Sequence, residues 1–139
     1  MNLVLDASVV VKWFSQDDPA EAHIDEAMAL FYRVKQGKDH VLQPTHWKAE
    51  VLAVLARDRP KEVDVLAGVL DAMKLPVLDS LNVYQRAAHL SVKHKHHLFD
   101  TLYHAVALET GAEFITADKK YARKAVGEGA MVLLGEVRL

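Results

Sequence analysis

The sequence predicts an α/β fold, a three-layer α/β/α arrangement with a central, mainly parallel sheet of about five strands. Short apolar runs of strand length alternate along the chain with longer segments whose apolar residues recur at helical spacing. Prolines, glycines and short polar residues stand between these segments, where helices begin and end. Strands that alternate with helices in this way form parallel sheets. We expect a single domain over residues 1–139.

In the first half of the chain, residue types that start helices stand directly before segments of helical periodicity. Ser8 follows the first apolar run and is positioned to cap a short helix. Asp18 and Pro19 supply a cap and a first-turn proline for the next helix, and Thr45 and Pro60 mark two more helix starts. The sequence therefore predicts strands over residues 3–6 and 41–43 and helices over residues 8–14, 19–36, 45–57 and 60–73.

The second half of the chain continues the alternation. Asp79 and Ser80 can cap a helix that dissolves into a polar run of histidines and lysines. Gly111 is the glycine stop of the following helix, and Asp118 is positioned to cap a lysine-rich helix. We expect strands over residues 76–78, 113–116 and 131–134 and helices over residues 80–92, 100–111 and 118–127.

The composition narrows the class of protein. Hydrophobic residues make up 51% and charged residues 26% of the chain, which excludes a disordered protein. The short apolar stretch at the start is interrupted by Asp6, so we expect neither a signal peptide nor a membrane span. The absence of cysteine excludes disulfides and thiolate metal sites, and the expected location is cytoplasmic. A net charge of −2 argues against a generally basic nucleic-acid binder.

Four carboxylates that are far apart in the chain fall where such a sheet would bring side chains together. Asp6 ends the first strand and Asp118 follows the fourth, whereas Glu50 and Asp100 lie near the starts of helices. Ligands of open α/β sheets bind at the carboxyl ends of the strands. Taken singly, the aspartates are more simply explained as caps and Glu50 as a solvated surface charge. Taken together, they favour one acidic pocket.

An acidic pocket of this kind is typical of a metal site. Two carboxylates about 4 Å apart repel by roughly 4 kcal/mol at an effective dielectric constant of about 20. The pocket must therefore protonate some carboxylates or bind a hard divalent cation such as Mg²⁺ or Mn²⁺. Such an ion activates water and stabilises charge on a phosphate, which predicts phosphodiester hydrolysis.

Three blocks of the sequence carry a resemblance to a known family. They read LVLDASVVVKWF, PTHWKAEVLAVL and LFDTLYHAVALETGAEFITADKKYA. Together they resemble the PIN-domain ribonucleases over nearly the whole chain, and the last block is the most specific, because its helix, glycine stop, strand and T-x-D motif occur in the family order. The short length and the D-A-S start resemble the VapC-type toxins of toxin-antitoxin pairs.

The resemblance implies roles for individual residues. The implied metal ligands are Asp6, Asp100 and Asp118. Glu50 would complete the pocket as a second metal contact or as the residue that positions water. Ser8 and Thr116 match small hydroxyl positions of the family, and their hydroxyls can hold a carboxylate rotamer or an outer-shell water.

Local basic residues are candidates for RNA contacts. Lys119, Lys120 and Arg123 lie on the helix after the T-x-D motif, although ordinary solvation is the usual role of such a run. Lys12 is a further candidate. His104 follows Asp100 by four residues and therefore lies on the same face of the predicted helix. This spacing is equally compatible with an RNA contact and with ordinary packing.

A run of three histidines precedes the C-terminal block, at His94, His96 and His97. It is interpreted as a solvated loop, because no neighbouring residue fixes the geometry of these side chains. A transition-metal tract is the alternative.

The leading hypothesis is a metal-dependent endoribonuclease that is the toxin of a VapBC-type pair. The resemblance implies an RNA substrate, a small VapB-like antitoxin as partner, and a homodimer or a higher-order toxin-antitoxin complex. A housekeeping PIN-domain nuclease that acts without an antitoxin is the first alternative. A receiver-like domain that binds Mg²⁺ expects adjacent acids after the first strand, where Asp6 stands alone, and a dehalogenase-like phosphatase expects D-x-D there, where Ser8 occupies the second acidic position.

Overall fold

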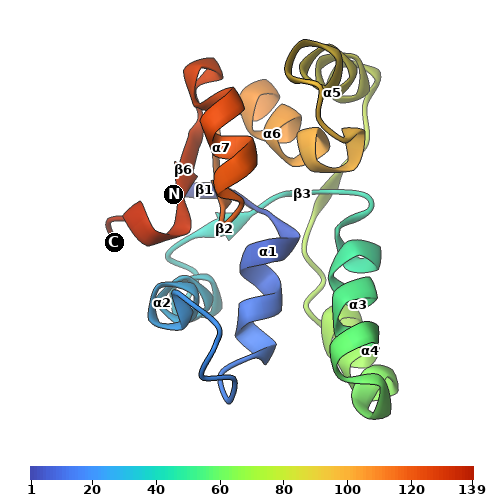
Figure 1. Ribbon diagram of the computed structural model, residues 1–139, viewed down its shortest axis with the longest axis vertical. Helices are drawn as coiled ribbons and strands as arrows, with labels where there is room; N and C mark the ends of the chain where they lie inside the picture. Colours follow the sequence, from blue (N-terminus) through green and yellow to red (C-terminus); the bar gives the residue numbers. More distant parts are fainter.

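The structure, a computed structural model, describes residues 1–139 as alternating strands and helices (Figure 1). The strands are β1 (Asn2–Leu5), β2 (His40–Val41), β3 (Gln43–Pro44), β4 (Val77–Leu78), β5 (Glu113–Thr116) and β6 (Met131–Leu133). The α-helices are α1 (Ala7–Val10), α2 (Ile24–Lys35), α3 (Trp47–Asp58), α4 (Val63–Ala72), α5 (Leu81–His94), α6 (Leu98–Thr110) and α7 (Lys119–Ala125). The 3₁₀ turns are η1 (Val11–Phe14), η2 (Pro60–Glu62), η3 (Val126–Glu128) and η4 (Leu134–Glu136).

The layers follow the predicted plan. The strands run across the middle of the molecule, with α5 and α6 on one side and α1 to α4 on the other (Figure 1). The main sheet has the order β2-β1-β5-β6, and every pairing in it is parallel. This arrangement confirms the α/β/α class with a mainly parallel sheet.

The main sheet has four strands, fewer than expected, because the second strand breaks in two. β2 pairs with β1, but β3 turns away and pairs with β4 in a separate two-stranded parallel sheet. At the break the side-chain amide of Gln43 replaces the backbone ladder. Its Nε2 donates to the Leu5 carbonyl over 2.8 Å, and its Oε1 accepts from the Leu5 N–H over 2.9 Å. Gln43 is completely buried, so these bonds satisfy polar groups that would otherwise be unpaired in the core.

One hydrophobic core joins the sheet to the helices on both of its sides. In β1, Leu3, Val4 and Leu5 are completely buried. Helix α6 is buried continuously from Thr101 to Ala107, as expected of a helix that is apolar on nearly every side. The two elements that position Asp6 and Asp100 therefore belong to the buried framework of the molecule.

Several predicted boundaries are confirmed where local signals decide them. Ser80 caps α5 by accepting a hydrogen bond from the Val83 N–H over 3.2 Å. Gly111 ends α6 in the left-handed conformation, with φ of 73°, and β5 covers the predicted residues. Asp118 caps α7 by accepting a hydrogen bond from the Tyr121 N–H.

The predicted start of α2 is wrong. The helix begins at Ile24, and Pro19 lies in a stretch of turns before it. This stretch is fixed from the side by Lys12, whose buried Nζ lies 2.5 Å from Glu21 Oε1 and 2.7 Å from the Ala22 carbonyl oxygen. A tertiary contact therefore overrides the local proline signal.

Two predicted caps are also wrong. Asp6, not Ser8, occupies the N-cap position of α1, and His46, not Thr45, occupies that of α3. Helix α6 begins earlier than predicted, so that Asp100 lies in its first turn. Each of these shifts is of one or two residues.

Candidate active site

Asp6 lies at the carboxyl end of β1 and is almost completely buried. Its N–H continues the pairing of β1 with β5 by donating to the Ile115 carbonyl over 3.0 Å. Its Oδ2 accepts one hydrogen bond from Ser8 Oγ over 2.5 Å and another from Thr116 Oγ1 over 3.0 Å. The two hydroxyls therefore hold this carboxylate in one rotamer.

The T-x-D motif links two of the carboxylates. Thr116 Oγ1 donates to Asp6 and accepts from the Asp118 N–H over 3.0 Å. Asp118 Oδ1 caps α7 by accepting from the Tyr121 N–H over 3.1 Å. Its other oxygen, Oδ2, lies 3.8 Å from His96 Nε2. Capping and participation in the site thus use different oxygens of the same carboxylate.

Asp100 and Asp118 meet at His96. The Nε2 atom of His96 lies 3.0 Å from Asp100 Oδ2 and 3.8 Å from Asp118 Oδ2. One ligand atom from each of these three residues lies within 4.8 Å of the others. The group joins the segment after α5, the first turn of α6 and the N-terminus of α7, and it is compact enough to coordinate one metal ion.

The interpretation of His96 as part of a solvated loop is wrong. Its side chain is only 8% exposed, and its ring lies 4.6 Å from the ring of Tyr121. At the end of α5, Lys95 takes the left-handed conformation, with φ of 51°, and His96 follows directly after this reversal. Glycine is the usual residue in that conformation, so a lysine there gives no local sequence signal of the turn.

Glu50 approaches from α3. Its Oε1 accepts a hydrogen bond from the Tyr103 hydroxyl over 2.9 Å and lies 3.8 Å from His46 Nε2. The Glu50 side chain is 27% exposed, so it is not the fully solvated surface charge that was the alternative. Glu50 and Asp6 are not among the three residues grouped at His96.

Burial and mutual repulsion disfavour the fully ionised form of the carboxyl groups in this site. Burial raises the pKa of Asp6 to about 6, and the charges of Asp100 and Asp118 add to the increase. Burial also raises the pKa of Glu50 to about 7, with added repulsion from Asp6 and Asp100, while the hydrogen bond from Tyr103 opposes the rise. A divalent cation favours the ionised form of both groups, so this oxygen-rich donor set fits a hard metal ion.

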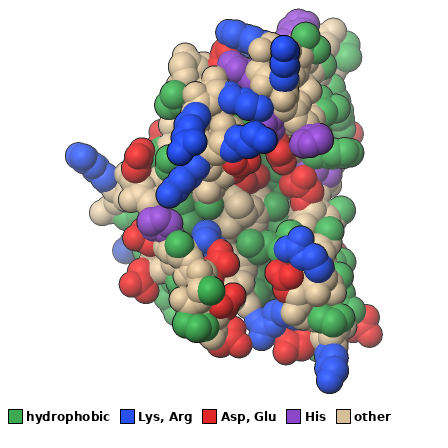
Figure 2. All heavy atoms as spheres, viewed as in Figure 1, with side chains coloured by type: hydrophobic (Ala, Val, Ile, Leu, Met, Phe, Trp, Pro, Cys, Tyr) green, Lys and Arg blue, Asp and Glu red, His purple; other side chains and the backbone are tan.

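Basic side chains gather beside the acidic ones. Figure 2 shows Lys and Arg side chains over α7, next to Asp and Glu side chains near the centre of the same face. Lys119, Lys120 and Arg123 are exposed on this helix. All three are therefore accessible to a nucleic-acid backbone.

The two remaining expected RNA contacts, Lys12 and His104, are buried, so neither is exposed to RNA as expected. Lys12 is 5% exposed and is occupied by Glu21 and the Ala22 carbonyl. His104 is completely buried, with Nδ1 2.9 Å from the Tyr121 hydroxyl and Nε2 2.8 Å from the Gly129 carbonyl oxygen. For His104, packing is the alternative that the structure favours.

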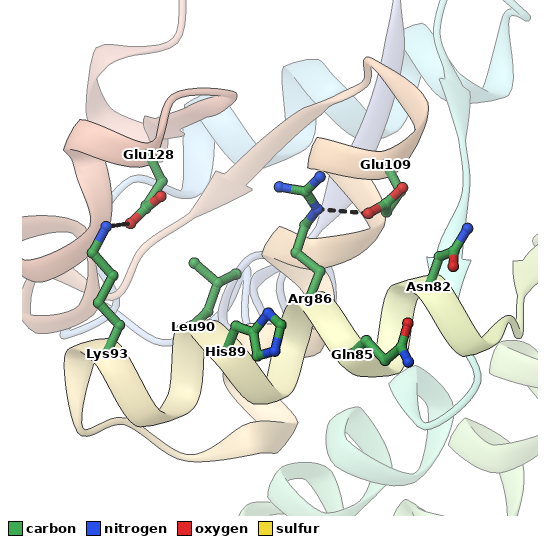
Figure 3. Close-up of a pocket in the computed structure, with 8 residues that line it drawn as sticks. All are labelled: Asn82, Gln85, Arg86, His89, Leu90, Lys93, Glu109 and Glu128. Carbon is green, nitrogen blue, oxygen red and sulfur yellow. Dashed lines mark hydrogen bonds and ion pairs between the residues drawn. The ribbon is translucent and has the colours of Figure 1, made fainter.

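A cavity of about 470 Å³ lies away from the carboxylates, between α5, the end of α6 and η3 (Figure 3). Arg86 extends from α5 to Glu109 on α6, and Lys93 extends to Glu128, each pair 2.6 Å apart. The charges that line this cavity are therefore neutralised in pairs. Nothing in it converges on a point as the carboxylates do.

Residues 3–127 match the family model of the PIN domain. The chain belongs to the PIN-domain family. This confirms the family that the three sequence blocks resemble, and PIN domains are generally nucleases. None of the helices of this PIN-domain protein is both long and apolar enough to cross a membrane.

The fold is also that of a solved structure, a toxin-antitoxin complex from Klebsiella pneumoniae. The two chains are 17% identical and superpose with a TM-score of 0.63, over 99% of this chain and 100% of the other. At this identity the similarity establishes the shared fold. No curated protein matches the sequence of this PIN-domain protein.

Proposed function

We propose that this PIN-domain protein is a metal-dependent endoribonuclease and the toxin of a VapBC-type toxin-antitoxin pair. The observation that carries the proposal is the convergence of Asp6, Asp100 and Asp118 at the carboxyl ends of β1 and β5 from segments far apart in the chain. Membership of a family of nucleases supports the reaction class.

In the proposed site, Asp6, Asp100 and Asp118 hold Mg²⁺ or Mn²⁺. When bound, such an ion lowers the pKa of a water molecule and stabilises negative charge on the scissile phosphate. Ser8 and Thr116 keep Asp6 in position through their hydroxyl hydrogen bonds. The exposed basic side chains of α7 bind the phosphates of the RNA.

Glu50 is assigned the transfer of a proton from the attacking water. Burial raises the pKa of this carboxyl group to about 7 in the metal-free protein, and a bound cation lowers it, so the group is ionised near neutral pH as a general base must be. The contacts from Tyr103 and His46 are both to Oε1, so Oε2 is available to orient the water.

The proposed partner is a small VapB-like antitoxin, and we expect a homodimer or a higher-order complex of the two proteins. The shared fold with a toxin-antitoxin complex supports this class of assembly. A groove of about 370 Å³ offers an apolar surface for a partner, lined mainly by hydrophobic residues including Phe14, Met28, Phe31, Val69 and Met73.

The reaction is tested with purified protein and single-stranded RNA. We expect cleavage with Mg²⁺ or Mn²⁺ and none in EDTA. Asp100→Asn should lower the rate by more than about 100-fold, because even outer-shell changes cost about 10- to 100-fold. Full cleavage in EDTA, or full activity of Asp100→Asn, contradicts the proposed site.

The toxin assignment is tested separately by expression in a bacterium. The wild-type chain should arrest growth, Asp100→Asn should not, and co-expression of the small gene that neighbours it should restore growth. Cleavage of RNA in vitro without growth arrest would instead favour the housekeeping nuclease.

A further inference from the structure

We infer that His96 supplies a nitrogen ligand to the metal ion and makes this site favour first-row transition-metal ions over Mg²⁺. The inference rests on the proposed metal-dependent function and names the ions that the site prefers. Carboxylates alone suit hard ions such as Mg²⁺, whereas imidazole raises affinity for later ions of the series from Mn²⁺ to Cu²⁺.

The distances fit a shared ion. Around an octahedral ion with bonds of about 2.1 Å, neighbouring ligand atoms lie about 3.0 Å apart and opposite ones about 4.2 Å apart. His96 Nε2 lies 3.0 Å from Asp100 Oδ2 and 3.8 Å from Asp118 Oδ2, within that range. Small movements of three side chains are therefore enough to place one ion among them.

His96 is held in this position by its surroundings. Its side chain is only 8% exposed, and its ring packs against the ring of Tyr121. The left-handed Lys95 precedes it, and Lys124 Nζ contacts its Nδ1 atom over 3.3 Å. The neighbouring histidines differ, because His94 Nε2 is paired with Glu128 and His97 is exposed.

The hydrogen bonds of the two His96 ring nitrogens show which ring proton must move when a metal ion binds. Because Lys124 is a donor, Nδ1 of His96 accepts its hydrogen bond and Nε2 donates to Asp100. When Nε2 binds a metal ion, the ring proton moves to Nδ1 and the contact with Lys124 is released. Lys124 is an exposed side chain that also donates to the Lys95 carbonyl over 3.2 Å, so it retains a partner.

The competing role for His96 is to orient Asp100 through a hydrogen bond without touching the ion. His96→Gln separates the two roles, because glutamine keeps an N–H donor for Asp100 but has no imidazole. His97→Gln is the matched control, since His97 is the adjacent histidine and its side chain is exposed.

The first measurement is electron spin-echo spectroscopy of the full chain loaded with Mn²⁺. We expect coupling to a directly bound imidazole nitrogen in the wild type and in His97→Gln, and its loss in His96→Gln. The second measurement is calorimetric titration with Co²⁺ and with Mg²⁺. His96→Gln should bind Co²⁺ at least about tenfold more weakly and should change Mg²⁺ affinity by less than about threefold.

Each other outcome overturns the inference in an identifiable way. Mn²⁺ binding without nitrogen coupling, or with coupling that persists in His96→Gln, removes His96 from the ligand set and leaves the proposed nuclease function standing. Equal losses for Co²⁺ and Mg²⁺ reduce His96 to a positioning residue for Asp100. If the wild type binds neither Mn²⁺ nor Mg²⁺, the inference and the proposed function both fail.

Discussion

Glu50 is the residue whose ionisation most directly affects the proposed reaction. Its pKa of about 7 means that the carboxyl group is mostly protonated below this pH and mostly ionised above it. A general base must be ionised, and the cation that cleavage requires favours the ionised form, so the rate of RNA cleavage should rise with pH over a range somewhat below 7. Glu50→Gln should lower the rate by about 100-fold or more and remove this rise, as measured by initial rates.

A matched control for this experiment is Glu136→Gln, because Glu136 is an exposed glutamate near the C-terminus. It should keep both the wild-type rate and the wild-type pH profile. If the rise with pH survives in Glu50→Gln, another group transfers the proton and the role given to Glu50 is wrong.

Thr116 is the residue that couples two carboxylates. In Thr116→Val, which has nearly the same shape, Asp6 loses a donor and the Asp118 N–H loses its acceptor. We expect the free energy of unfolding to fall by about 1–3 kcal/mol. Affinity for Mn²⁺ should fall by about 10- to 100-fold. Urea denaturation and calorimetry measure the two effects.

Thr110→Val separates stability from metal binding. The Thr110 hydroxyl donates to the Val106 carbonyl over 2.7 Å at the far end of α6, remote from the first turn that carries Asp100. This variant should leave Mn²⁺ affinity unchanged. An equal loss of affinity in both variants contradicts a specific role for Thr116.

At the scale of elements, α7 is the helix that would bind RNA. Lys120→Ala combined with Arg123→Ala removes two exposed positive charges from it. RNA affinity should fall, and the slope of its logarithm against the logarithm of salt concentration should decrease by about 1.4, since each single-strand phosphate contact contributes about 0.7. Fluorescence anisotropy in EDTA measures binding without cleavage.

A matched double variant is Lys35→Ala with Lys38→Ala, which removes two exposed lysines at the end of α2 and just after it. The salt dependence of RNA binding should then stay as in the wild type. Equal changes in both double variants mean that binding responds to net charge alone, and α7 loses its assigned role.

Elements with strong local signals were predictable from the sequence. Gly111 ends α6 and Asp118 caps α7 as predicted, because a left-handed glycine and a capping carboxylate act through their own backbone. The start of α2 and the break of the second strand were not predictable. Both depend on side chains that reach across the fold, from Lys12 to Glu21 and from Gln43 to Leu5.

At the scale of the whole molecule, the site residues that were predictable are those with local signals, and the one that was missed depends on tertiary packing. The aspartates could be proposed because each follows a strand or lies at a helix start. His96 could not, because its place depends on the left-handed turn at Lys95 and on packing against Tyr121. Conversely, the sequence spacing that made His104 a candidate says nothing of its complete burial.

The acidic site also affects the stability of the whole molecule. Asp6 has a pKa of about 6 in the folded protein and 3.8 as its ordinary value, so the folded form binds more protons than the unfolded chain between these values. Stability of the metal-free protein therefore decreases as pH rises through this window, by roughly 3 kcal/mol in all, and the loss is complete above the folded pKa. Lowering the pH, or binding a cation, restores the stability that is lost when Asp6 ionises.

Asp6→Asn tests this relation between site and stability. The amide oxygen can still accept hydrogen bonds from Ser8 and Thr116, but the buried charge is gone. In EDTA at about pH 7.5 the variant should unfold at a higher urea concentration than the wild type, and this gain should shrink toward pH 4 as Asp6 becomes protonated. Added Mn²⁺ should stabilise the wild type more than the variant, because ligand binding to the folded state alone raises stability. A gain that is the same at both pH values would instead reflect better packing, and the charge of Asp6 in the proposed metal site would then carry no cost in stability.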